Sequence, residues 1–279
     1  MSWRFATTPK WIVRHVLVVA VVGATLWAGF WQLRRLDEKR DQRDQVEAQQ
    51  HQPVIDIASV IPADVEVGDA AVEAVVYRPV TATGTYADDE TVVVENRSYN
   101  GAPGGWVLTP LVLDDGTAVV VNRGFVGFDR EGAVVAPPAP AGEVTVRGLL
   151  RESQERGSIG RVDPSGEELD VLARADIDRY QEQVEADLYP VYLQLEESDP
   201  PEPEPAAGEP QIVTLGPPET DLGPHLGYAV QWFIFSAIAA GGYLLLLRRV
   251  AKDSAKSDAA VAKADDLDHE LEELLRSER

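Results

Sequence analysis

Residues Val16–Leu33 read VLVVAVVGATLWAGFWQL, and residues Gly227–Leu247 read GYAVQWFIFSAIAAGGYLLLL. Neither stretch contains a charged side chain. As helices, their 18 and 21 residues are long enough to cross the hydrocarbon core of a membrane, at 1.5 Å of rise per residue. The two stretches therefore predict two transmembrane helices with one domain between them.

Each stretch has a competing interpretation. The first resembles the apolar region of a cleaved signal peptide, but Trp27, Phe30 and Trp31 stand where a small-residue cleavage site is expected. The second could be a buried helix of a globular protein, but Arg248 and Arg249 follow it directly, as in a cytoplasmic flank. Transmembrane helices remain the favoured interpretation of both.

Basic residues predict the orientation. Five follow the second span, namely Arg248, Arg249, Lys252, Lys256 and Lys263. None occurs between Glu182 and Leu226. The positive-inside rule then places the C-terminus in the cytoplasm, and two spans bring the N-terminus to the same side.

The predicted organisation has six segments. They are a cytoplasmic tail (1–11), the first transmembrane helix (12–33), an external β-rich domain (34–198), a Pro/Glu-rich linker and lead-in (199–226), the second transmembrane helix (227–247) and a cytoplasmic amphipathic tail (248–279).

The charge resides in the external part. The chain carries a net charge of −22, and residues 48–226 contain 33 acidic residues against 10 Arg and no Lys. Such a surface predicts no nucleic-acid binding, because phosphate contacts need a dense basic surface. We interpret the acidity as favouring solubility, with a cationic partner as the alternative. The absence of cysteine excludes disulfides, thiol catalysis and cysteine-ligated metals.

The central domain shows strand patterns. In Val80–Tyr86, small or apolar residues alternate with three threonines, which indicates a half-buried strand. Asp114-Asp115-Gly116 separates two apolar runs and predicts a hairpin turn. These patterns predict a mainly antiparallel β domain, either a barrel or a sandwich. The further expected strands are Thr91–Glu95, Val107–Leu113, Thr117–Val121, Val144–Leu150 and Tyr189–Leu195.

Three other segments have readable patterns. Ser165 and Glu168 are spaced as a capping box, and the apolar residues after them predict a small helical insert. Asp199–Pro210 is rich in proline and glutamate, which predicts an extended, mobile linker. The heptad-like spacing of Ala260, Ala264, Leu267, Leu271 and Leu274 predicts an amphipathic helical tail. No enzyme signature is present, so we expect a protein that is not an enzyme.

Motifs at the ends of the two spans and in the central domain resemble those of the surfeit locus protein 1 family. They are Gly29-Phe30-Trp31-Gln32-Leu33-Arg34-Arg35, Gly84-Thr85-Tyr86, Asn96-Arg97, Leu108-Thr109-Pro110, Asn122-Arg123-Gly124-Phe125-Val126 and Pro224-His225-Leu226-x-Tyr228-Ala229-x-Gln231-Trp232-Phe233. They occur in the family's order, and the similarity covers most of residues 5–250. Gln231 departs from the pattern, because many members have Thr there.

The resemblance implies an assembly factor for haem–copper cytochrome c oxidase. Such a protein binds haem a and presents it to subunit I, with haem a synthase as a second partner, in contact with membrane lipid. The lack of a transit peptide suggests a bacterial plasma-membrane protein with both termini cytoplasmic and the main domain external. The alternatives are a haem-free structural chaperone and an unrelated two-span sensor or secretion subunit.

The resemblance also implies a haem site. His225 matches the family's haem a ligand at the start of the second span, and a hydrogen-bonding His at a helix end is the alternative. Trp31 and Gln32 end the first span on the same side, either as pocket lining or as interfacial anchors. Tyr228 and Trp232 share the helix face of His225 and pack either on a porphyrin or on the first span. Arg123 is a candidate partner for a propionate, with structural pairing in the acidic domain as the alternative.

Overall fold

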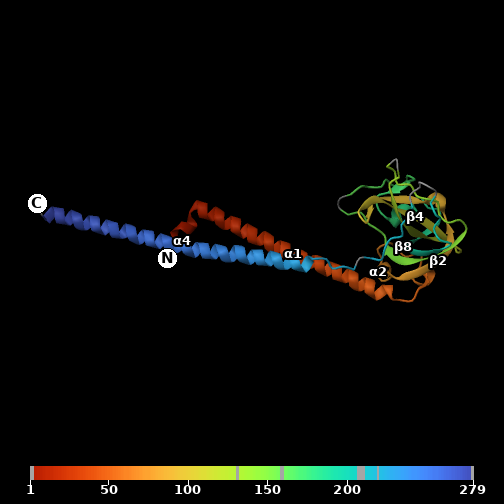
Figure 1. The fold of residues 1–279 in the computed structure, drawn as a ribbon, viewed down its shortest axis with the longest axis horizontal. Coiled ribbons are helices and arrows are strands. Elements are labelled where there is room, and N and C mark those ends of the chain that lie inside the picture. Colours follow the sequence, from red (N-terminus) through yellow and green to blue (C-terminus); the bar gives the residue numbers. More distant parts are fainter. Residues whose placement is uncertain (1–2, 130–131, 158–159, 206–210, 219, 278–279) are drawn as a thin grey trace. The chain divides into compact units, whose positions relative to one another are not determined.

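The computed structural model describes residues 3–129, 132–157, 160–205, 211–218 and 220–277. These residues divide into two compact units. One unit contains the chain up to Asp41 together with the chain from Asp221 onward, and the other runs from Gln42 to Thr220. The first is a pair of long helices and the second is a sheet domain (Figure 1).

The helix pair consists of α1 (Pro9–Gln50), up to Asp41, and α4 (His225–Ser277), preceded by the short 3-10 helix η1 (Arg4–Thr7). Both long helices are long and apolar enough to cross a membrane. Only 6% of the most apolar window of each is buried, so the side chains face outward instead of filling a protein core. This exposure does not fit a buried globular helix and is compatible with membrane insertion.

A repeat of three and four residues marks where the two helices meet. On α1, side chains at positions 15, 18, 22, 25, 29, 32 and 36 are all at least partly buried. On α4, positions 225, 229, 232, 236, 239 and 243 follow the same rule. This spacing is the seam of two helices that pack side by side. The predicted amphipathic tail continues α4, but the side chains of residues 265–277 lie outside the described residues.

The sheet domain contains eight strands within its described residues. They are β1 (Ile55–Asp56), β2 (Pro79–Tyr86), β3 (Val92–Tyr99), β4 (Ala102–Leu113), β5 (Thr117–Gly127), β6 (Glu143–Glu152), β7 (Val171–Leu172) and β8 (Asp187–Asp199). Short helices connect some of them, namely η2 (Ile57–Ser59), α2 (Ala70–Glu73), η3 (Asp88–Glu90) and α3 (Ile177–Gln181).

The strand order is β1-β2-β6-β8-β5-β4-β3-β7, and β2 also pairs with β4. The pairings β2–β6, β6–β8, β8–β5, β5–β4 and β4–β2 thus form a ring. Gly84 allows the pairing of β2 with β4, since a Cβ at this position would lie 2.1 Å from the carbonyl oxygen of Val112. The sheet is mixed and not purely antiparallel, because β8 runs parallel to β5 and two short pairings are also parallel.

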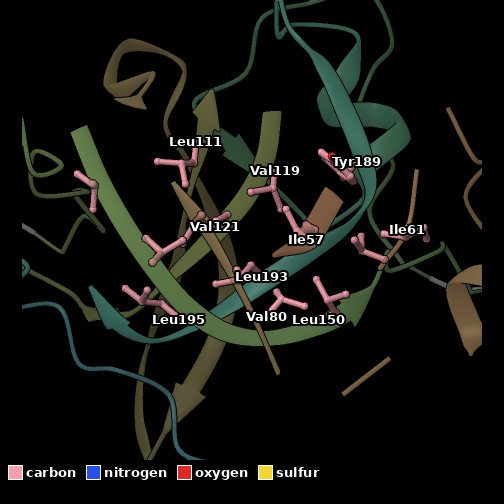
Figure 2. Close-up of a cluster of buried hydrophobic side chains, with 14 of the residues drawn as sticks. Ile57, Ile61, Val80, Leu111, Val119, Val121, Leu150, Tyr189, Leu193 and Leu195 are labelled. Atoms are coloured by element: carbon pink, nitrogen blue, oxygen red, sulfur yellow. The ribbon is translucent and has the colours of Figure 1, made fainter. Parts of the chain in front are cut away.

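The core of the sheet domain lies where the strands curve around one another. Figure 2 shows Val80, Leu111, Val121, Leu150 and Leu193, which come from five different strands, directed toward a common interior. On β5, Val119 and Val121 belong to this cluster, whereas Ala118 and Val120 belong to a second cluster on the other face, with Tyr180 of α3. The period of two predicted for Val80–Tyr86 is confirmed, since the burial alternates along β2.

Two local expectations need correction. Ser165 and Glu168 do not cap a helix; α3 begins at Ile177, and the carboxylate of Asp176 accepts a hydrogen bond from the backbone N–H of Arg179. The first part of the predicted linker Asp199–Pro210 is held in place, because Glu202 forms an ion pair with Arg123, whereas residues 206–210 lie outside the described residues. The lead-in that follows is also attached, because Val213 exchanges two backbone hydrogen bonds with Phe125. Its Gly216 carbonyl also accepts a hydrogen bond from Gln194.

The end of α1 belongs to the sheet domain. Val46 is fully buried against Val76 and Tyr77. Gln45 and Gln49, on the same helix face, donate hydrogen bonds to the carbonyls of Glu73 and Ala74. The helix of the first span therefore continues into the segment assigned to the β-rich domain, and its last turns are anchored there by packing and amide hydrogen bonds.

Candidate functional site

The site begins where α4 begins. His225 is the first residue of α4, directly after Pro224, and it is partly buried. Its ring atom Nδ1 lies 2.8 Å from the side-chain oxygen Oε1 of Gln32 on α1. An amide oxygen only accepts, so Nδ1 carries the proton and donates it. In the neutral ring this leaves Nε2 as the nitrogen with a free lone pair.

Aromatic residues adjoin this hydrogen bond along both helices. Trp31 is 45% exposed and Tyr228 is 49% exposed. Trp232 is partly buried and packs edge-on against Phe235, with ring centroids 5.9 Å apart. The structure thus brings Gln32 to His225 and leaves large aromatic faces uncovered on the adjoining helix surfaces.

Close packing of small residues holds the helices together just beyond the imidazole. Gly29 and Ala229 are both buried. A Cβ at Gly29 would lie 2.8 Å from the ring of Phe233, which itself packs edge-on against Phe30 at 5.3 Å. The absence of a side chain at Gly29 therefore makes room for this aromatic pair.

Two further polar contacts cross between the helices. The hydroxyl oxygens of Thr25 and Ser236 are 2.7 Å apart, and the hydroxyl of Tyr243 lies 2.6 Å from Nδ1 of His15. With the pair of Gln32 and His225, they join the helices at three levels. The other nitrogen of His15 contacts the carbonyl of Ala6 at 3.0 Å, so both of its ring nitrogens are engaged. Sequence reasoning missed these contacts, although the seven-residue spacing of Ala229, Ser236 and Tyr243 was a readable signal.

Arg123 does not share the role expected from the resemblance. It lies in the sheet domain on β5 and is fully buried. Its Nε and Nη2 atoms bind both carboxylate oxygens of Glu202 at 3.0 and 2.6 Å, and its remaining contacts go to the carbonyls of Pro137 and Pro138. Because these acceptors already use its guanidinium, Arg123 is a structural residue and not a ligand for a propionate. The sequence left this pairing open but did not identify Glu202.

The Arg123–Glu202 pair is closely packed. Tyr86 lies against the guanidinium, with the ring centroid 5.7 Å from it. Burial and then the charge of Glu202 raise the pKa of the Tyr86 hydroxyl, with Arg123 acting in the opposite direction. The pair therefore ties the segment after Asp199 to the inner side of the sheet domain.

The helix pair and the sheet domain together define a class of protein: two terminal helices of membrane-spanning length flank a mixed-sheet domain, and an imidazole stands at the start of the second helix. The chain belongs to the SURF1 family, whose sequence model matches residues 19–237. This family is known in general for the assembly of cytochrome oxidase.

Individual relatives agree with this membership. Uncharacterized SURF1-like proteins of Mycobacterium bovis and Mycobacterium tuberculosis are each 29% identical over 243 residues, which cover 85% of this chain and 83% of theirs. A SURF1-like protein of Monosiga brevicollis is 27% identical over 250 residues, covering 83% of this chain and 87% of its own length. An unrelated sensor or secretion subunit is therefore not supported.

Proposed function

We propose that the chain is a non-enzymatic assembly factor that binds haem a through His225 and presents it to subunit I of cytochrome c oxidase. The observation that carries this proposal is the hydrogen bond from Nδ1 of His225 to Gln32 at 2.8 Å. A histidine that ligates a metal usually donates its other ring N–H to an acceptor, which selects the tautomer and orients the ring. Gln32 supplies that acceptor here.

The surroundings of His225 suit a haem as cargo. Neutral imidazole is a common axial ligand of haem iron. The exposed ring faces of Trp31 and Tyr228, and the more buried Trp232, offer apolar contact area for a macrocycle. His225 would hold the iron through Nε2, while the three aromatic residues would supply packing without a bond to the metal.

The alternative function is that of a haem-free structural chaperone, in which other proteins deliver haem a. Both functions share subunit I as a partner and membrane lipid as the surroundings of the helices. Haem a synthase is a partner only when the chain receives haem. The haem content of the purified protein therefore separates the two functions, because only the haem-binding function predicts that haem a purifies with the protein.

The test is the spectrum of the full-length protein purified from membranes that contain haem a. We expect His225→Ala to remove the bound haem, and Tyr228→Ala or Trp232→Ala to weaken binding less. His15→Ala is the matched control, since His15 also sits on the helix pair but has both nitrogens engaged. Full haem content and an unshifted Soret band in His225→Ala would refute ligation. Retained co-purification of subunit I would then favour the chaperone alternative.

We also propose a topology, with both termini in the cytoplasm of a bacterial cell and residues 48–226 outside. The basic residues after Leu247 support it. Alkaline phosphatase joined after Gly142 should be active, whereas the same enzyme joined at Arg279 should be inactive. The opposite pattern would refute the orientation without affecting the haem proposal.

A further inference from the structure

A second candidate site lies within the sheet domain and shares no residue with the proposed haem site. A cavity of about 770 Å³ opens there between β3, β6 and the segment after β7. Three of its lining residues are arginines, one from each of these elements, namely Arg97, Arg151 and Arg174. Residues 48–226 contain only 10 Arg against 33 acidic residues. The gathering of three of them around one cavity is therefore unexpected from composition.

Two of these arginines lack a carboxylate partner. Nη2 of Arg97 donates to the amide oxygen of Gln154 at 2.6 Å, and Nη1 of Arg151 donates to the amide oxygen of Gln194 at 3.1 Å. In the part of the chain that the structure describes, no acidic side chain lies within ion-pair distance of either. The third cavity arginine, Arg174, lies 3.8 Å from a carboxylate oxygen of Asp176. Carboxylate partners are also present for Arg123, Arg147, Arg161 and Arg179.

Both guanidinium groups are held in place by aromatic rings. Arg97 lies over Trp106 at 4.3 Å from the ring centroid, and Arg151 lies over Tyr77 at 4.8 Å. Such stacking covers one flat face of each guanidinium and leaves the N–H edges for hydrogen bonds. Nε of Arg97 is buried and has no hydrogen-bond partner. A donor of this kind is costly to leave unpaired, so Nε of Arg97 favours an acceptor bound nearby.

The electrostatics of the cavity also favour an anion. Burial is the main reason that the pKa of Arg97 is lowered, and the neighbouring charge of Arg174 lowers it further against the opposite effect of Tyr192. Tyr192, which lines the cavity, is 2% exposed, and burial raises its pKa. Its hydroxyl therefore stays protonated at neutral pH and is available as a neutral donor.

We propose that this cavity is a binding site for a small organic anion that carries at least two carboxylate or phosphate groups. The guanidinium fork matches both groups, and two separate forks call for two anionic groups. The volume is that of a small-molecule site and exceeds what a single inorganic ion needs. The carboxylates of Glu73, Glu152 and Glu155 also line the cavity, but all three are exposed residues, so solvent weakens their competition for the guanidinium groups.

Calorimetric titration of the full-length protein in a neutral detergent tests this proposal. The probes are citrate for carboxylates and pyrophosphate for phosphates, at constant ionic strength, with acetate as the singly charged reference. We expect saturable binding of citrate, pyrophosphate or both, and no saturable binding of acetate. Which probe binds identifies the anionic group.

Variants connect the binding to the cavity. Arg97→Gln and Arg151→Gln should each raise the Kd at least about tenfold. Arg147→Gln is the matched control, because Arg147 lies on the same strand as Arg151 but is paired with Glu197 and does not line this cavity. Its Kd should equal that of the unchanged protein. The proposal would be overturned if Arg97→Gln and Arg151→Gln had the same Kd as Arg147→Gln. The absence of saturable binding of either probe to the unchanged protein would also overturn it.

A measurement on the unchanged protein guards against misfolded variants. Hydrogen exchange at residues 151–155 and 173–174 should slow when the bound probe is present, since these backbone segments line the cavity. Exchange that is unaltered there, at a probe concentration that saturates the calorimetric signal, would also overturn it. Neither outcome depends on haem content.

Discussion

The imidazole of His225 and the amide of Gln32 lie 193 positions apart in the chain and share a hydrogen bond of 2.8 Å. Gln32 lies one residue before the end of the first apolar stretch, and His225 lies two residues before the start of the second. The bond therefore selects the tautomer of a histidine at a position where the resemblance to the SURF1 family expects a ligand.

The first prediction concerns the amide of Gln32. Gln32→Leu keeps much of the side-chain volume but removes the acceptor for Nδ1 of His225, so the ring loses its fixed tautomer and orientation. We expect haem affinity to fall about 10–100-fold, as for other residues that orient a metal ligand. Titration of haem a into the purified variant measures this change. Gln231→Leu, at an exposed amide of α4, should leave the affinity unchanged, and a comparable loss there would contradict the role given to Gln32.

The second prediction concerns the packing of Gly29. Gly29→Leu would force the ring of Phe233 away, because even a Cβ would lie 2.8 Å from it. Overpacking of this kind costs about 1–3 kcal/mol. Since the chain has no cysteine, a disulfide between Thr25→Cys and Ser236→Cys reports on the helix pair directly. Cross-linking should drop in Gly29→Leu and persist in Gly23→Leu, because a Cβ at Gly23 meets nothing within 4 Å.

The third prediction concerns the buried ion pair of the sheet domain. Glu202→Gln leaves Arg123, which is fully buried, without its charged partner. Removal of one member of a buried pair costs about 3–5 kcal/mol. Thermal or denaturant unfolding of the full chain checks this loss. Glu197→Gln breaks the exposed pair with Arg147 and should cost less than about 1 kcal/mol. Equal losses in the two variants would show that the Arg123–Glu202 pair contributes no more than a surface contact.

The fourth prediction concerns the hairpin between β4 and β5. The hydroxyl of Thr117 donates to Asp115 at 2.6 Å, and this bond is the main reason that the pKa of Asp115 is lowered, followed by the bond from the backbone N–H of Thr117. A carboxyl whose folded pKa lies below its unfolded value stabilises the fold above the unfolded pKa, and this contribution is lost as pH falls through the folded pKa.

Thr117→Val removes the hydroxyl bond and keeps the backbone bond, so the pKa of Asp115 should rise part of the way to its ordinary value. The acid limb of the stability curve should then move to higher pH. Carboxyl carbon shifts in an NMR titration follow this group, with Asp114 as the internal reference. A pKa of Asp115 that stays unchanged in Thr117→Val would refute the stated cause.

Local patterns in the sequence determined the elements themselves. The uncharged stretches Val16–Leu33 and Gly227–Leu247 predict long helices. Apolar segments of this length indicate membrane-spanning helices by their own composition, without reference to any contact elsewhere in the fold. The alternation along Val80–Tyr86 and the turn at Gly116, with a φ of 86°, follow from neighbours within three residues. The motifs that resemble the SURF1 family also pointed to the membership that the family match shows.

Only the tertiary structure decided how distant residues combine. The capping-box spacing of Ser165 and Glu168 does not start a helix, and α3 begins at Ile177 instead. The carbonyls of Pro164 and Glu167 accept hydrogen bonds from the side chain of Arg179 on that helix. The parallel pairing of β5 with β8 and the partner of Arg123, 79 positions away, depend on which surfaces meet after long loops close. A residue's sequence neighbours specify its secondary structure, but its partner across the fold is set by packing and by the pairing of buried polar groups, which no local pattern records.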